Sequence, residues 1–404
     1  MMRVLHVVKT SDGASWAASQ AEVLVRLGIE VHVALPSDQG RTVSAWRQAG
    51  AHIHIADLSL PLGRPHQIAD TLKRTRRLVD EVQPDLIHSH FVTTTLTLRL
   101  ALGRNHRIPR VFQVAGPLHL EHLHTRQADL RTAGQADYWV ASSRCIGQHY
   151  QACGIAKDRL FLSYYGSRVR PAPRSGMLRT KLGLPAAARI VGNISYIYPP
   201  KRFLGERVGL KGHEELIDAL AIVTARDQNV YGVLVGNTLP GYGDSYERTL
   251  RKRALQAGGG RILMPGYFSP DEVRQSWPDF DCAVHVPHSE NCGGVVEPLS
   301  AAVPVIAAAV GGLPEVVIDN VTGKLVSDRR PEALAQSIAQ VLADPEHWRK
   351  LSTRGRRLVE RMFDVNRTSG EVLSIYKHIV TGTPRPEPFD SERFATQATE
   401  FAVV

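Results

Sequence analysis

Short β-branched runs alternate with amphipathic stretches along this chain, and the alternation starts again past the middle. Strands separated by helices in this way predict an α/β architecture with parallel, doubly wound sheets. In such sheets, ligands bind beyond the carboxyl ends of the strands. The first series has expected strands at 4–8, 30–35, 52–56, 84–90, 110–114 and 138–141, with helices at 17–27 and 67–82. The second has strands at 189–195, 231–235, 262–264, 282–286 and 305–308, with helices at 213–226, 246–256, 297–302 and 332–342.

Two domains are expected, because 404 residues exceed what one hydrophobic core usually supports. A segment at 165–176 that contains Pro and Gly is typical of a linker. The predicted domains are 1–168 and 169–364, and a helix at about 365–380, after a break near Asp364, is expected to complete the first. Residues 381–404 are predicted to be a polar tail that is ordered only if it packs on something.

The composition is typical of a soluble globular protein, with 43% apolar and 22% charged residues. No apolar run approaches the length of a membrane span, and residues 1–9 are too short and too broken by His6 for a signal peptide. The four cysteines show neither zinc-finger spacing nor a dense disulfide framework. A reduced, cytoplasmic location is therefore expected.

The formal net charge of +10 could indicate an anionic partner, but no nucleic-acid motif accompanies it. One basic cluster, Lys73, Arg74, Arg76 and Arg77, lies on an expected helix. It is first interpreted as a solvated helix face. The alternative is peripheral docking to anionic lipid at the inner face of a membrane, where a lipid-linked acceptor would be found.

The most informative segment runs from Val286 to Glu315 and contains two glycine loops, each after an expected strand. Gly293 and Gly294 allow a ligand to approach the backbone, and the helix start beyond Val295 offers free N–H groups that suit a diphosphate. Two carboxylates, Glu290 and Glu297, flank this loop and can accept hydrogen bonds from sugar or ribose hydroxyls. The second loop, 311–315, makes an ordinary glycine turn a weaker interpretation than a nucleotide-sugar site.

This segment resembles the donor-site signature of the family 4 retaining glycosyltransferases, which have the GT-B fold of two Rossmann-like domains facing across a cleft. Similar motifs follow in order along nearly the whole chain, and the ordered set is far more specific than any one of them. They are Gly13 in the first strand–helix loop, 85–90 as D-x-x-H-x-H, 136–143 as A-D-x-x-x-x-S, Lys211-Gly212, Val235-Gly236 and the turn at 320–326.

In the second domain, the resemblance implies that Glu297 holds the ribose hydroxyls of the nucleotide and that Glu290 orients the donor sugar. Gly293, Gly294 and Val295 would lie against the nucleotide. Lys211, with Arg207 beside it, would neutralise the leaving diphosphate. No cofactor and no metal are expected beyond the nucleotide sugar itself.

In the first domain, which the resemblance assigns to the acceptor, Gly13 would let its loop approach the diphosphate or the acceptor. His119, just past a strand end, would lie against the reacting sugar, and a structural role is the close alternative. His88 and His90 are interpreted mainly as structural.

The chain also departs from the family pattern. Glu290 and Glu297 are seven positions apart where relatives have eight, so Ser289 could take the place of Glu290. Glu206 stands where relatives carry an arginine, for which Arg207 or Arg202 would substitute. Ala14 stands where many relatives have a second glycine, and 196–209 resembles an insertion over the donor site.

The expected function is transfer of a hexosyl group from a nucleotide sugar, with UDP the commonest carrier among relatives, to an acceptor hydroxyl with retention. The acceptor would be a surface polysaccharide, a glycolipid or a small natural product. Two alternatives stay open: a catalytically inactive sugar-nucleotide-binding partner subunit, favoured by the shortened spacing, and another enzyme on the same fold, such as a sugar-nucleotide epimerase or a phosphorylase.

Overall fold

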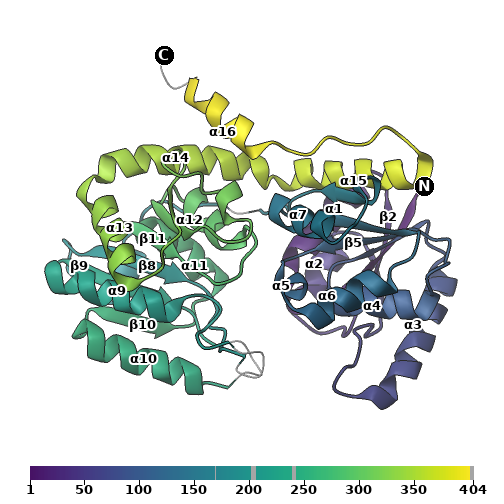
Figure 1. Cartoon of the computed structure of the whole chain (residues 1–404), viewed down its shortest axis with the longest axis horizontal. Coiled ribbons are helices and arrows are strands. Elements are labelled where there is room, and N and C mark those ends of the chain that lie inside the picture. Colours follow the sequence, from purple (N-terminus) through teal and green to yellow (C-terminus); the bar gives the residue numbers. More distant parts are fainter. Residues whose placement is uncertain (169, 202–205, 239–242, 401–404) are drawn as a thin grey trace. The chain divides into compact units, whose positions relative to one another are not determined.

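The computed structural model describes residues 1–168, 170–201, 206–238 and 243–400. The chain divides into two compact units, each built on one parallel sheet (Figure 1). Unit 1 comprises Met1–Arg168 and Arg361–Phe389, and unit 2 comprises Val169–Glu360 and Asp390–Val404. The predicted α/β class with two doubly wound sheets is confirmed.

Unit 1 contains a seven-stranded parallel sheet in the order β3-β2-β1-β4-β5-β6-β7. Its central strands are buried on both faces, which explains their nearly continuous apolar sequence. The strands are β1 Arg3–Val7, β2 Glu30–Leu35, β3 His52–Ile55, β4 Leu86–Ser89, β5 Arg110–Val114, β6 Asp137–Ala141 and β7 Leu160–Leu162.

Helices of unit 1 cover its sheet, and α15 from the end of the chain packs beside α1 (Figure 1). Val372, Ile375 and Tyr376 of α15 join the same buried cluster as Leu24 of α1. The helices are α1 Ser15–Arg26, α2 Val43–Gln48, η1 Pro65–Gln67, α3 Ile68–Val82, α4 Val92–Leu102, α5 Leu118–Glu121, α6 Leu123–Thr132, α7 Arg144–Ala152, η2 Lys157–Arg159 and α15 Val365–Thr381.

Unit 2 contains a six-stranded parallel sheet in the order β10-β9-β8-β11-β12-β13. Its strands are β8 Arg189–Ile194, β9 Val230–Val235, β10 Ile262–Gly266, β11 Cys282–His285, β12 Val305–Ala308 and β13 Lys324–Val326. Its helices are α8 Met177–Lys181, α9 His213–Arg226, α10 Ser245–Gly258, α11 Pro270–Ser276, η4 Trp277–Asp279, η5 Gly293–Val295, α12 Val296–Ser300, η6 Leu313–Glu315, α13 Pro331–Ala343, α14 Pro345–Met362 and α16 Ser391–Glu400. The last two residues of α14 belong to unit 1.

Two sequence expectations concern local structure. The helix break expected near Asp364 is confirmed, because Asp364 caps α15 by accepting the backbone N–H of Arg367 at 2.7 Å. The basic residues of α3, Lys73, Arg74, Arg76 and Arg77, are all exposed, which both the solvated-face interpretation and the lipid-docking alternative require. Among the described residues, no helix is both long and apolar enough to cross a membrane.

Candidate functional site

The segment with the strongest sequence signal lies at the carboxyl end of β11, in the middle of the unit 2 sheet. All four residues of β11 are buried, and the chain leaves the strand into the loop that carries Glu290. The loop then forms the single turn η5 and the five-residue helix α12. Ligands of parallel sheets bind at this end of the strands, so the sequence motif and the topology indicate the same place.

Glu290 lies at the centre of a polar cluster in this loop. Its Oε2 atom accepts hydrogen bonds from Lys211 Nζ and, at 3.1 Å, from His285 Nε2, and its Oε1 atom accepts the Asn291 backbone N–H at 3.0 Å. Burial alone would raise the pKa of Glu290, but the Lys211 ammonium and the His285 hydrogen bond outweigh burial and hold the pKa well below its usual value. Glu290 is therefore a carboxylate at neutral pH.

His285 fixes the position of Glu290 through its own hydrogen bonds. Burial lowers the pKa of His285, although the Glu290 carboxylate opposes the shift, so the ring is neutral at pH 7. A neutral ring that donates from Nε2 to Glu290 must accept at Nδ1, where Asn193 Nδ2 lies at 3.2 Å. The chain Asn193–His285–Glu290 thus sets both the tautomer of the ring and the direction of the carboxylate.

Glycines let these segments come together. A Cβ atom on Gly294 would lie 2.0 Å from His285 Nε2, so this glycine makes room for the ring. Gly212 and Gly311 have φ angles of +68° and +57°, which favour glycine. A Cβ atom on Gly212 would lie 2.1 Å from the Val286 carbonyl oxygen, and one on Gly311 would lie 1.8 Å from the Glu290 carbonyl oxygen. Gly293, in contrast, is exposed with nothing within 4 Å of its Cβ position, so the space beside it is open.

Glu297 and Val295 occupy the short helical part of the loop. Glu297 is exposed, and its Oε2 atom accepts the indole N–H of the buried Trp277 at 3.0 Å. Val295 is fully buried as a whole residue, backbone included, so its predicted contact with the nucleotide stays a prediction. The expectation that a helix start would hold a diphosphate is weakened, because α12 has only five residues.

The two predicted cations differ in their surroundings. Lys211 is brought to Glu290, with the two side chains only 15% and 14% exposed, and its ammonium also lies 5.6 Å from the centroid of the Tyr198 ring. Arg207 is exposed, and residues 202–205 beside it, including Arg202, lie outside the described residues. Glu206 accepts the Lys201 backbone N–H at 2.8 Å.

In unit 1, the first strand–helix loop bends at a different residue than the sequence suggests. Gly13 has an ordinary backbone, and a Cβ atom there would only touch Thr10 at 3.5 Å. Ala14, at the start of α1, takes the left-handed conformation with φ 61°. This is the position at which many relatives carry the second glycine.

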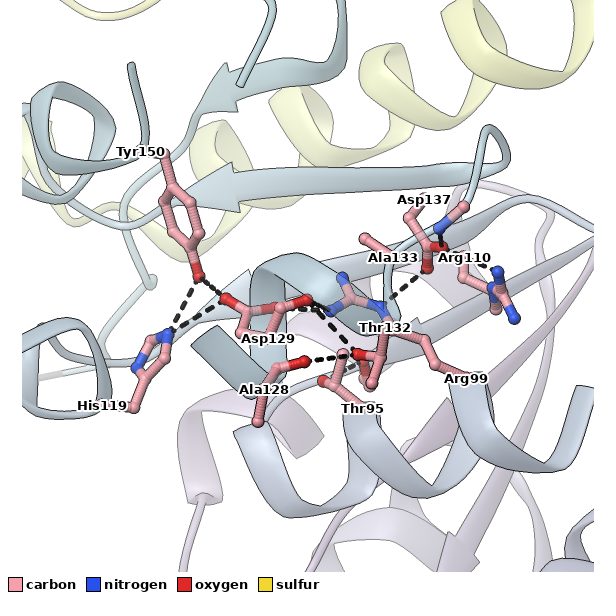
Figure 2. Close-up of polar contacts among 12 residues, drawn as sticks. Thr95, Arg99, Arg110, His119, Ala128, Asp129, Thr132, Ala133, Asp137 and Tyr150 are labelled. Atoms are coloured by element: carbon pink, nitrogen blue, oxygen red, sulfur yellow. Dashed lines mark hydrogen bonds and ion pairs between the residues drawn. The ribbon is translucent and has the colours of Figure 1, made fainter. Parts of the chain in front are cut away.

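His119 belongs to a mostly buried polar network in unit 1 (Figure 2). Its Nε2 atom lies 2.9 Å from the Tyr150 hydroxyl and 3.5 Å from Asp129 Oδ2, and Tyr150 donates to the same carboxylate at 2.7 Å. Burial would raise the pKa of Asp129, but Arg99 and His119 lower it to about 2. This anchoring gives His119 a structural role, and its contact with a sugar stays a prediction.

His88 and His90 are fully buried together with His6. His88 Nδ1 bonds the Tyr376 hydroxyl of α15, His90 Nδ1 lies 3.3 Å from the Tyr165 hydroxyl, and His6 Nδ1 lies 3.0 Å from His90 Nε2. These partners are internal, which agrees with the structural interpretation of both residues.

Sequence reasoning missed two residues of the Glu290 cluster, His285 and Asn193, and a buried histidine near it, His213. His213 is buried beside Ser195, 3.4 Å from its hydroxyl, and burial, with smaller effects from His285 and Lys211, lowers the pKa of His213 to about 4. The available signal was that His285 and His213 each lie close in sequence to a residue of a recognised motif, Glu290 and Lys211.

Two family models match this chain in succession. The model described as Glycosyltransferase Family 4 matches residues 14–166, and the model described as Glycosyl transferases group 1 matches residues 202–358. The two matched ranges fall in unit 1 and unit 2 respectively.

Relatives of the chain agree with these matches. A D-inositol 3-phosphate glycosyltransferase of Saccharomonospora viridis is 32% identical over 226 residues, or 52% of this chain and 47% of the relative, so the match spans about half of that protein. One from Thermobispora bispora is 26% identical over 363 residues, covering 84% and 81% of the two chains. The crystal structure of Anabaena HepE in complex with UDP and glucose has a TM-score of 0.76 and 20% identity, covering 93% of this chain and 99% of that one.

Proposed function

Since the chain belongs to the family 4 glycosyltransferases and has their GT-B fold, we propose that it transfers a sugar from a nucleotide-diphosphate sugar to an acceptor hydroxyl. In this proposal unit 2 binds the donor and unit 1 binds the acceptor. The observation that carries it is the pairing of Lys211 with Glu290 at the carboxyl end of β11.

The Lys211–Glu290 pair offers a cation and a carboxylate to the two halves of a donor. A diphosphate would draw the Lys211 ammonium away from Glu290, because two phosphate charges attract it more strongly than one carboxylate. Glu290, held by His285 and Asn291, would then be free to accept hydrogen bonds from the sugar hydroxyls. Glu297 would hold the ribose, and the space at Gly293 would admit the diphosphate.

We propose retention at the anomeric carbon through reaction on one face of the sugar. The acceptor oxygen bonds to the anomeric carbon on the face from which the diphosphate leaves, and the departing phosphate oxygen takes the acceptor proton. The protein then contributes orientation and charge stabilisation through Lys211 and Glu290. Arg207, exposed and four positions before Lys211, would add a second cation.

UDP is the proposed carrier, supported by the UDP in the Anabaena HepE complex. The two relatives named above are D-inositol 3-phosphate glycosyltransferases, so D-inositol 3-phosphate is the first acceptor to test. Glycans and lipid-linked acceptors follow, and with lipid acceptors the exposed basic face of α3 would contact an anionic membrane.

The first experiment is thermal unfolding with UDP, GDP, ADP and CMP on the wild type and Glu297→Ala. A nucleotide at a hundred times its dissociation constant stabilises a protein by about 2.7 kcal/mol, which raises the melting temperature by several degrees. Glu332→Ala is the matched control, since Glu332 is another exposed carboxylate in the first turn of a helix, α13. One nucleotide should stabilise the wild type and the control, and Glu297→Ala should lose most of the shift.

The absence of a shift with every nucleotide on a folded protein would contradict the donor site. Turnover separates the remaining possibilities. Release of UDP with an acceptor, and a product of unchanged anomeric configuration by proton NMR, supports transfer with retention. A new sugar nucleotide formed without acceptor indicates an epimerase, and nucleotide binding without turnover indicates an inactive partner subunit.

A further inference from the structure

Four side chains of metal-ligating types share one face of the edge strand β3 and its neighbour β2 in unit 1. Glu30 and His32 are two residues apart on β2, and His52 and His54 are two residues apart on β3. Residues two apart on a strand point to the same face. His32 and His52 are partners in the parallel pairing of the two strands, so both pairs project to the same side.

Three of these side chains are close enough to surround one ion. His32 Nε2 lies 3.0 Å from Glu30 Oε1, and His32 Nδ1 lies 2.9 Å from His54 Nε2. Glu30, His32 and His52 each offer a ligand atom within 4.8 Å of the other two. A tetrahedral ion with bonds of about 2.0–2.2 Å needs its ligand atoms roughly 3.3–3.6 Å apart, so small rotations of Glu30, His32 and His52 suffice. His54 contacts the other ring nitrogen of His32 and would orient that ring.

The cluster is also accessible and carries negative charge. His52 is exposed, and Glu30, His32 and His54 are half-buried, so an ion can enter from solvent. Glu30 supplies a carboxylate, and Glu81 of α3 acts electrostatically on His54. Arg3 is the opposing charge, since its Nε atom donates to Glu30 Oε1 at 2.8 Å, and it would have to share this carboxylate with the ion.

Among the described residues, one other group could hold a metal: His6, His88 and His90. These side chains are fully buried, and their hydrogen-bond partners among the described residues are histidine and tyrosine side chains rather than carboxylates. A divalent ion there would lose its hydration with no negative charge to compensate. The edge cluster is therefore the better site.

We propose that Glu30, His32 and His52 bind one divalent transition-metal ion of the Zn²⁺ class, with His54 orienting the His32 ring through its other nitrogen. Imidazole and carboxylate together suit zinc, nickel and copper, whereas magnesium and calcium prefer oxygen ligands alone. The ion would link the edge strand β3 to its neighbour β2. The three ligands lie in the amino-terminal halves of these strands, away from the carboxyl ends where ligands of parallel sheets bind, so the site is separate from the proposed transfer reaction, which is expected to proceed without metal.

The test is titration of untagged, chelator-treated protein with zinc chloride alone, followed by isothermal calorimetry. The wild type should bind one ion per chain, and His52→Ala/His54→Ala should bind at least about tenfold more weakly. The matched control is His66→Ala/His347→Ala, which also removes two exposed histidines and should leave the affinity unchanged. Circular dichroism of the metal-free variants shows whether each is folded, and the single variant His52→Ala replaces the double variant if that fails to fold.

A second readout is the visible spectrum with cobalt chloride, because a tetrahedral nitrogen and oxygen site gives intense bands that the aqueous ion lacks. These bands should appear with the wild type and the control and be lost in His52→Ala/His54→Ala. If the wild type binds no zinc, the proposal is overturned. If His52→Ala/His54→Ala keeps the affinity and spectrum of the wild type, the proposal is also overturned, because the ion then binds elsewhere.

Discussion

Glu290 is the residue on which the proposed donor site depends most. It is ionised, nearly buried and held by three donors from different parts of unit 2. Such preorganisation costs nothing further when a sugar binds, because the carboxylate is already oriented.

We predict that Glu290→Gln lowers kcat about a hundredfold or more, since the amide cannot supply the charge that the sugar hydroxyls would use. UDP affinity should be kept or increased, because Lys211 loses its competing carboxylate. Steady-state kinetics with UDP titration measure both quantities. Glu332→Gln on the surface of α13 is the control, and an unchanged kcat in Glu290→Gln would exclude the proposed role.

The neighbouring glycines allow a matched comparison. Gly294→Ala should displace the His285 ring, because the new Cβ atom would lie 2.0 Å from Nε2, and the lost support of Glu290 should reduce both stability and activity. Gly293→Ala adds the same methyl group to open space, so it should fold normally and affect only nucleotide affinity. Melting temperatures together with UDP titrations distinguish the two, and equal melting temperatures would contradict the packing explanation.

For individual residues, the sequence predicted which side chains lie near one another, but it predicted their hydrogen-bond partners less well. Glu290 and Lys211 were assigned to one site from motifs 79 residues apart, and the structure joins them. His285 was missed because a buried histidine in a strand has no sequence signature of its own. His119 was placed near the sugar, but its bonds to Tyr150 and Asp129 depend on long-range packing that no local pattern records.

Among the helices and strands, α1 begins next to a residue whose backbone is strained. Ala14 holds the left-handed conformation at the helix start, which costs a residue with a Cβ atom about 1–2 kcal/mol relative to glycine. The loop has to bend here to connect β1 with α1, and the sequence supplies its glycine one position earlier.

Ala14→Gly should therefore stabilise unit 1 by up to about 1 kcal/mol, after the entropy cost of the added glycine, and raise its melting temperature by roughly 2–4 °C. The same substitution at Ala45, inside α2, should destabilise it by a similar amount. Differential scanning calorimetry of the two variants measures the contrast. A lower melting temperature for Ala14→Gly would show that the conformation is not strained.

Helices and strands with a clear hydrophobic periodicity were predictable from the sequence, and short or unusual ones were not. The buried apolar strands of both sheets were expected within a few residues of their observed bounds. β7 and β13 have three residues each, too few for an alternation to show. α4 was missed because its threonines Thr93, Thr94, Thr95 and Thr97 favour strands, and the helix forms because several of its residues are buried against unit 1.

For the molecule as a whole, buried histidines determine the response to acid. Burial lowers the pKa of His6 to about 3 and of His213 to about 4, and it also lowers the pKa of His88, His90 and His285. Below about pH 6.5 the unfolded chain takes up protons at these residues and the folded chain does not.

Stability should therefore fall as the pH drops from about 6.5 to 4.5, by up to about 1.4 kcal/mol per pH unit for each histidine. The lowered pKa values of Glu290 and Asp129 act only below about pH 4.5, outside this range. Melting temperatures from pH 8 to 4.5 measure the effect. His213→Gln should give a shallower slope and the exposed His66→Gln an unchanged one, whereas a flat wild-type profile would contradict the argument.

The return of the chain to unit 1 at Arg361–Phe389 has a consequence for synthesis. Val372, Leu373, Ile375 and Tyr376 complete the core that Leu24 and Trp46 begin, so the first residues to leave the ribosome cannot finish folding alone. Roughly 190 further residues must be translated before this helix arrives, a delay on the order of 10–40 s. During that interval the groove that α15 will fill is an exposed apolar surface, and it is the part of the nascent chain that a chaperone would protect.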